Sequence, residues 1–242
     1  HSLSEPKPSC PDNMTKQKLF KKTNKDFIAS LPRFLYDGPI EIIDQKDAAE
    51  TTVQKLLQAG GILGFDTETR PSFKRGEGHK VALLQIADKE KCYLFRLSKT
   101  GLTDGLTALL SNPEILKIGL SLRDDLSALR KRRDFEPKNC LDLQNLVRRL
   151  GIEDMSLQKL YANVFGQRIS KKTRLTNWEA PELTENQQRY AATDAVACIR
   201  LYERLMALSA SGNYELLIPD DETQQTPSTV QAASEKNDKT NH

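Results

Sequence analysis

The sequence has few of the features that mark secreted, zinc-binding or membrane-spanning proteins. Its four cysteines, Cys10, Cys92, Cys140 and Cys198, are far apart and form no C-x-x-C pair. Neither a disulfide framework nor a zinc site is therefore indicated. No apolar run approaches the roughly 20 residues of a membrane helix, and the first residues show no secretory signal pattern. These absences lead us to expect a protein of the reducing cytoplasm without a membrane segment.

The chain also has little excess charge. Its 36 basic and 33 acidic residues give a net charge of +3, which is too small for a protein that coats nucleic acid non-specifically. Any phosphate binding must then come from local basic clusters, although each cluster taken singly is more simply explained as a solvated face. Three such clusters occur: Lys74, Arg75 and Lys80; Lys131, Arg132 and Arg133; and Lys171, Lys172 and Arg174.

The length of 242 residues suits one domain with tails. The acidic tail, residues 219–242, is rich in Gln, Ser, Thr and charged residues, and we predict that it is disordered because it has too little apolar surface to bury. We predict the same of a basic leader, residues 1–25. The folded domain is expected over residues 26–218.

Within this domain, hydrophobic periodicity predicts strands and helices in an order typical of an α/β fold. Short links between the second, third and fourth strands imply antiparallel neighbours, and a later crossover helix implies a parallel strand, so we expect a single mixed sheet flanked by helices. The predicted strands are 40–44, 61–68, 80–88, 91–97 and 115–120; the predicted helices are 46–60 and 102–112, with further helices from about 122 to 208.

Two carboxylates lie on the strand "GILGFDTE". Alternation along a strand places Gly64, Asp66 and Glu68 on one face and Leu63 and Phe65 on the other. Like charges this close raise the energy of both ions unless one is protonated or a cation lies between them.

Two further acids are predicted to face the interior. On a helix that begins near Leu122, Asp125 lies beside the apolar stripe while Asp124 points to water, although taken alone Asp125 also fits a carboxylate favoured by the helix dipole. On the helix 184–208, Asp194 lies within an apolar stripe, one turn after Tyr190. Four converging carboxylates would repel one another, and hard divalent cations with oxygen ligands are the simplest resolution. Two such ions suit phosphodiester hydrolysis.

These residues resemble a known signature. Asp66-x-Glu68, then Asp125 with Gly119 before it, then Tyr190-x-x-x-Asp194 is similar to the motif set of the DEDD superfamily of 3′–5′ exonucleases, in its tyrosine-containing branch. The resemblance covers about residues 40–206. Segments 80–95, 174–178 and 183–195 resemble Werner-type exonuclease domains more than RNase D.

The resemblance implies a ribonuclease H-like fold, two Mg²⁺ or Mn²⁺ ions and release of 5′-mononucleotides from a 3′ end. By residue, it implies that Asp66, Glu68 and Asp194 bind the first ion and that Asp66, with Asp125 partly through water, binds the second. Tyr190 would orient the attacking water. From the residues alone, Tyr190 is also explained as a core tyrosine with a satisfied hydroxyl.

The expected partner is nucleic acid with a free 3′ end, DNA rather than RNA. Lys171, Lys172 and Arg174 form a candidate phosphate clamp in a loop before Trp178. Thr67 is expected to offer its backbone to the terminal nucleotide. Trp178 is a candidate for stacking on a base, although a lone Trp is more often a packing anchor.

Two alternatives stay open at this point. The first is a catalytically silent member of the same fold that binds nucleic acid or a protein; loss of a carboxylate or the tyrosine would be its expected sign. The second is a metal-dependent phosphoesterase that acts on small nucleotides, which would not need the basic clusters.

Overall fold

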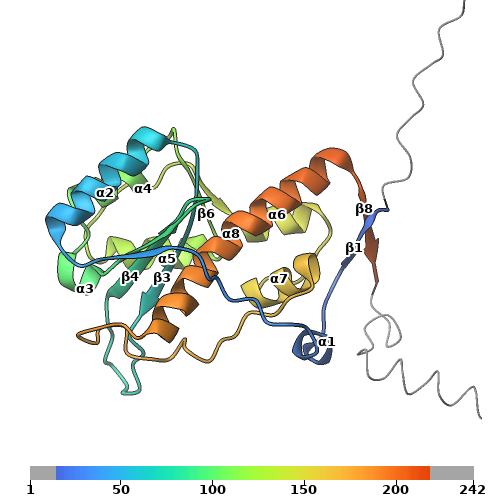
Figure 1. Ribbon diagram of the computed structural model, residues 1–242, viewed down its shortest axis with the longest axis horizontal. Helices are drawn as coiled ribbons and strands as arrows, with labels where there is room; N and C mark the ends of the chain where they lie inside the picture. Colours follow the sequence, from blue (N-terminus) through green and yellow to red (C-terminus); the bar gives the residue numbers. More distant parts are fainter. Residues whose placement is uncertain (1–14, 219–242) are drawn as a thin grey trace, which may run out of the picture.

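A six-stranded mixed sheet forms the centre of the computed structural model, which describes residues 15–218 (Figure 1). Across the sheet the strands are β2 (Ile40–Ile43), β5 (Cys92–Phe95), β4 (Val81–Ala87), β3 (Ile62–Thr69), β6 (Leu116–Gly119) and β7 (Cys140–Asp142). The pairs β3–β4 and β4–β5 are antiparallel, whereas β2–β5, β3–β6 and β6–β7 are parallel. The predicted α/β class and mixed sheet are confirmed.

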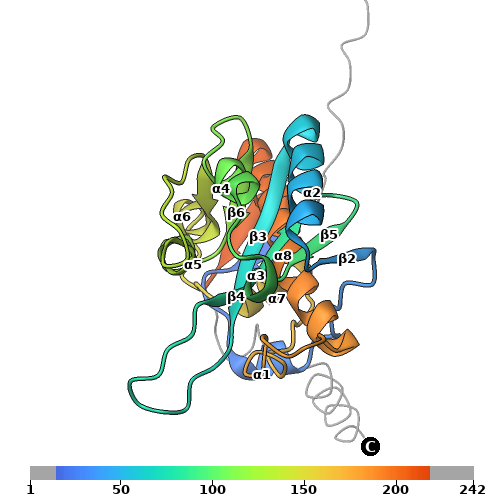
Figure 2. The same ribbon diagram turned by 90° about the vertical axis from the view of Figure 1, so that its left-hand side faces the viewer.

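Helices cover both faces of this sheet, so the central strands are buried on both sides (Figure 2). All seven residues of β4 are buried, as expected for a strand between two helical layers. One layer contains α6 (Leu143–Arg149), α7 (Leu157–Phe165) and α8 (Glu185–Ser211). The other contains α2 (Lys46–Ala59), α3 (Leu97–Thr100), α4 (Asp104–Leu110) and α5 (Leu122–Arg130).

The predicted disorder of the leader up to residue 25 is wrong for the part that the structure describes. β1 (Gln17–Phe20) pairs in parallel with β8 (Tyr214–Leu217), and α1 (Lys25–Ala29) follows. Leu19 is fully buried, and the Asn163 side chain bonds both backbone groups of Phe20. These partners lie more than 140 residues away, so local composition did not indicate them. Residues 1–14 and the predicted tail, 219–242, lie outside the described residues.

The five predicted strands of the main sheet are confirmed within two residues at each end, and the largest difference lies at β7. Helices were expected there, but Cys140–Asp142 adds a short strand beside β6. Three residues are too few for a periodic signal. A capping box begins α8: Thr184 Oγ1 accepts from the Gln187 N–H while the Gln187 side chain accepts from the Thr184 N–H. Within residues 15–218, no helix has both the length and the apolarity to cross a bilayer.

Gly64 sets how closely β3 approaches α8. A Cβ at this position would overlap the backbone carbonyl oxygen of Ala195 and the side chain of Ile199 on α8. Glycine allows such close backbone approach because it lacks that atom. The residue on the same strand face two positions later is Asp66, and Ala195 directly follows Asp194. The contact therefore sets the separation of these two acids.

We predict that Gly64→Ala lowers the free energy of unfolding by about 1–3 kcal/mol, because the added methyl overpacks a rigid backbone contact. Gly78→Ala is the matched control, since a Cβ there meets no atom within 4 Å. Urea unfolding of the two variants measures the difference. Equal stability of both variants would contradict the close approach of β3 to α8.

Candidate active site

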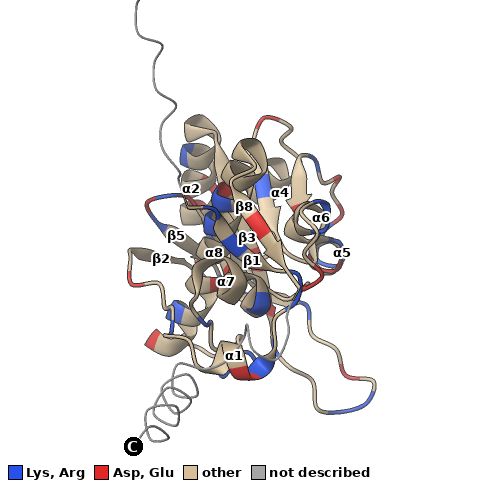
Figure 3. Ribbon diagram, turned by 90° about the vertical axis from the view of Figure 1, so that its right-hand side faces the viewer, with Lys and Arg blue, Asp and Glu red and all other residues tan. Residues whose placement is uncertain are grey.

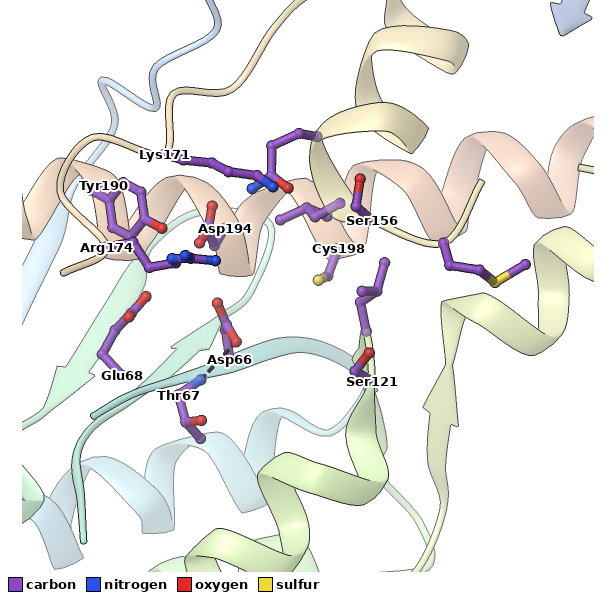
Figure 4. Close-up of a pocket in the computed structure, with 14 residues that line it drawn as sticks. Asp66, Thr67, Glu68, Ser121, Ser156, Lys171, Arg174, Tyr190, Asp194 and Cys198 are labelled. Atoms are coloured by element: carbon purple, nitrogen blue, oxygen red, sulfur yellow. Dashed lines mark hydrogen bonds between the residues drawn. The ribbon is translucent and has the colours of Figure 1, made fainter. Parts of the chain in front are cut away.

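Three carboxylates meet where β3 passes α8. Oxygen atoms of Asp66, Glu68 and Asp194 all lie within 4.8 Å of one another. Figure 4 shows the three side chains pointing into one space, two from β3 and one from α8. The predicted strand alternation explains the first pair, because Asp66 and Glu68 share the face of Gly64, which packs on α8.

The electrostatics of the three acids follow from burial and proximity. Burial, and then the Asp194 carboxylate, raise the pKa of Asp66 well above its usual range. Burial and the charges of Asp66 and Asp194 do the same to the pKa of Glu68. Burial raises the pKa of Asp194 to about 7. Without a cation, the group is therefore stable only when it holds protons.

The chemistry of the donor set fits a hard divalent cation. Asp194 is 5 % exposed, and its Oδ1 has no hydrogen-bond partner among the described residues. A buried carboxylate oxygen without a partner is costly, and a metal ion would supply the missing interaction. Carboxylate oxygens are the ligands that Mg²⁺ and Mn²⁺ prefer.

Asp125 lies next to this group rather than inside it. Its Oδ1 accepts a hydrogen bond of 2.9 Å from the Thr67 hydroxyl, and it is not one of the three acids that share the 4.8 Å cluster. Burial, and then the Asp66 charge, raise the pKa of Asp125 to about 8. Asp124 is exposed, so the predicted orientation of the α5 helix is confirmed.

Of the two aromatic residues singled out in the sequence, Tyr190 lines the cavity and Trp178 does not. Tyr190 is 6 % exposed but lines the cavity, and burial followed by the Asp194 charge raises its pKa, so the hydroxyl keeps its proton. Trp178 is fully buried, and its Nε1–H donates to the Arg174 carbonyl. The proposed stacking of Trp178 on a base is therefore wrong in this conformation; the ring anchors the loop instead.

The acids open onto a cavity of about 510 Å³. Lys171 and Arg174 also line it and bring positive charge close to Asp194 (Figure 4). Lys172 lines a separate cavity of about 390 Å³ near the start of α8, so the three basic residues of the predicted clamp do not act as one group. The backbone N–H of Thr67, which was expected to contact the terminal nucleotide, donates a hydrogen bond of 2.8 Å to Asp66 Oδ1.

Two residues that support the site were not predicted. Gln85 on β4 is fully buried, and its Nε2 lies 3.3 Å from both Glu68 Oε1 and the Ala191 carbonyl oxygen. The sequence feature that could have pointed to Gln85 is that it is the only polar residue in the apolar run "VALLQIA". Asp142 accepts from the backbone N–H groups of Ser121, Leu122 and Gln144. It thereby anchors the start of α5, which carries Asp125.

A model of the 3′–5′ exonuclease family matches residues 40–208, a span that contains all four acids and Tyr190. The chain belongs to the 3′–5′ exonuclease family. Among relatives, it is 35 % identical over 159 residues to the bifunctional 3′–5′ exonuclease/ATP-dependent helicase WRN of Mus musculus, a match that covers 63 % of this chain and 11 % of WRN.

Solved structures of exonucleases share the fold. RNase D of Escherichia coli matches with a TM-score of 0.62 and 27 % identity, over 72 % of this chain and 46 % of that one. The Nibbler EXO domain of Aedes aegypti matches with a TM-score of 0.67 and 21 % identity, over 75 % and 93 %. These likenesses support the expected ribonuclease H-like fold. The chain spans only about a tenth of WRN and less than half of RNase D.

The raised carboxyl pKa values predict how the stability of the metal-free exonuclease depends on pH. Unfolded carboxyls lose their protons near pH 4, whereas Asp194 and Asp125 hold theirs to about 7 and about 8 when folded. The folded state then binds more protons, so the free energy of unfolding in EDTA should fall as pH rises from about 4 to 8. Urea unfolding in EDTA at several pH values across this range measures the free energy of unfolding.

Added Mg²⁺ or Mn²⁺ should restore stability most strongly at the upper end of that range, because the cation binds the folded, deprotonated carboxylates. Asp194→Asn should weaken both effects, whereas Asp124→Asn should leave them unchanged. A stability profile that is flat with pH and insensitive to divalent cations would contradict this assignment.

Proposed function

We propose that this chain hydrolyses phosphodiester bonds from the 3′ end of nucleic acid and releases 5′-mononucleotides. The observation that carries the proposal is the cluster of three acids, two buried and Asp66 half-buried, one with an unpaired oxygen, which share an open cavity with Lys171 and Arg174. Basic side chains and carboxylates that line one cavity suit a phosphate that contacts both the basic residues and metal ions held by the acids. The catalytic domain is proposed over residues 26–218, extended by β1.

The acids are proposed to hold two divalent cations, Mg²⁺ or Mn²⁺. Asp66, Glu68 and Asp194 would hold the first, and Asp66 with Asp125 the second. When bound, such a pair stabilises both the attacking and the leaving oxygen of an in-line displacement at phosphorus. Gln85 Nε2 is placed to fix the Glu68 carboxylate, and the Thr67 hydroxyl is placed to fix Asp125.

The remaining cavity residues act on substrate and water. Lys171 and Arg174 neutralise the phosphate and hold it for attack. The Tyr190 hydroxyl keeps its proton because burial and the nearby acids raise its pKa, so it is suited to orient the attacking water by a hydrogen bond rather than to remove its proton. This role would place the chain in the tyrosine-containing branch of the DEDD superfamily.

The substrate is proposed as a nucleic acid strand with a free 3′ end. The expected preference for DNA over RNA finds no support among the relatives, which include RNase D of Escherichia coli, described as an exoribonuclease involved in structured RNA processing. A catalytically silent role is disfavoured because Asp66, Glu68, Asp125, Asp194 and Tyr190 are all present.

The direct test uses 5′-labelled DNA and RNA of the same sequence with Mg²⁺ or Mn²⁺. We expect products that shorten as a ladder from the 3′ end, and excess EDTA should stop the reaction. A strand blocked at its 3′ end should resist cleavage. Internal cuts in a closed circle would contradict an exonuclease, and hydrolysis of small nucleotides without a ladder would favour the phosphoesterase alternative.

The adjacent aspartates of α5 offer a matched pair of variants. Asp125→Asn keeps the shape but removes the charge proposed to hold the second cation, so turnover should fall by about 10²-fold or more. Asp124→Asn should stay within about twofold of the unchanged protein, because its side chain is exposed. Gel-based turnover at saturating substrate measures both. The opposite ranking would contradict the assignment of Asp125.

A further inference from the structure

The β3–β4 loop, residues 70–80, stands out from the body of the molecule (Figures 2 and 3). Its basic cluster of Lys74, Arg75 and Lys80 has no part in the cavity described above. Beside this cluster, Phe73 is 83 % exposed, the highest value among the exposed large apolar side chains of residues 15–218. A single exposed apolar side chain is common on protein surfaces, so what distinguishes Phe73 is the basic cluster beside it on the same loop.

The loop begins immediately next to the candidate site. Glu68 is separated from Arg70 by one residue, and both belong to the same continuous segment. Arg70 Nη1 lies 3.4 Å from Glu179 Oε2, and His79 Nδ1 lies 3.9 Å from the same oxygen. Glu179 follows the buried Trp178 in the loop that carries Lys171 and Arg174. The Arg70–Glu179 ion pair and the His79–Glu179 contact join the β3–β4 loop to the loop that carries Lys171 and Arg174.

The charge of the loop favours a polyanion as its partner. Residues 70–80 contain four cations and one acid, Glu77, which gives 4 − 1 = +3 with His79 neutral. Arg70 is paired with Glu179, whereas Lys74, Arg75 and Lys80 form no ion pair within residues 15–218. Three free cations beside an exposed ring form the combination that binds single-stranded nucleic acid without sequence preference, by phosphate contacts and base stacking.

We propose that the β3–β4 loop is a second nucleic-acid contact outside the cavity. Phe73 stacks on a base, and Lys74 and Arg75 contact phosphates of the substrate at nucleotides beyond those that occupy the cavity. The inference rests on the proposed function, because that function places the 3′ end of a strand within reach of this loop. It assigns the loop a role in binding longer substrates, not in the chemical step.

The test compares a labelled single-stranded 20-mer with a labelled dinucleotide, using fluorescence anisotropy in EDTA so that no hydrolysis occurs. Phe73→Ala should weaken 20-mer binding by about fivefold or more, as loss of one stacked base predicts, and should lower the ratio of 20-mer to dinucleotide affinity. Phe73→Leu should behave like Phe73→Ala, because it keeps an apolar side chain but removes the ring.

A charge variant tests the phosphate contacts separately. Lys74→Ala/Arg75→Ala should flatten the plot of log affinity against log salt for the 20-mer by up to about 0.7 per lost contact. The matched control is Lys46→Ala/Lys55→Ala, which removes the same charge from exposed positions on α2 and should leave the slope unchanged. Thermal unfolding confirms that each variant is folded.

Two results would overturn the proposal. The first is that the affinity for the 20-mer and the slope of log affinity against log salt stay unchanged in the Phe73 and Lys74/Arg75 variants. The other is an equal loss for the 20-mer and the dinucleotide, which would place the effect in the cavity. Failure of the proposed function is a distinct result: the unchanged protein would then hydrolyse neither substrate with Mg²⁺ or Mn²⁺, while the loop variants would still weaken 20-mer binding.

Discussion

The structure depends on the burial of like-charged carboxylates at the contact between β3 and α8. One carboxylate oxygen each of Asp66, Glu68 and Asp194 lies within 4.8 Å of the others. Such a group is stable only with bound protons or with a cation. The close approach that creates it needs Gly64, because any side chain at this position would push α8 away. The contact of Gly64 with α8 therefore determines both how β3 packs on α8 and where the acids of the proposed catalytic site lie.

Residues around this contact hold its parts in place by ordinary structural interactions. Gln85 bridges Glu68 and the α8 backbone. Asp142 secures the start of α5 through the backbone N–H groups of Ser121 and Leu122, and the buried Trp178 anchors the loop that brings Arg174 to the cavity. Each ties a proposed functional side chain to a rigid strand, helix or loop, which is how a preorganised site is maintained.

Periodicity predicted the parts of the site that lie on regular elements. Strand alternation placed Asp66 and Glu68 together, and helical periodicity turned Asp125 inward and Asp194 into an apolar stripe; the burial of each agrees with this. It could not predict features that depend on distant contacts. The burial of Trp178, the separation of Lys172 from Lys171 and the pairing of β1 with β8 each arise from tertiary packing, which local patterns do not report.

The central claim is that the three acids together bind a divalent cation. A crystal structure of the protein with Mn²⁺, with the ion located by anomalous scattering, tests this most directly. We predict a peak within about 2.0–2.3 Å of carboxylate oxygens from Asp66, Glu68 and Asp194, with Asp194 Oδ1 among the ligands. A cavity that stays without Mn²⁺ at saturating concentration, with Asp194 Oδ1 bonded to a protein group instead, would contradict the claim.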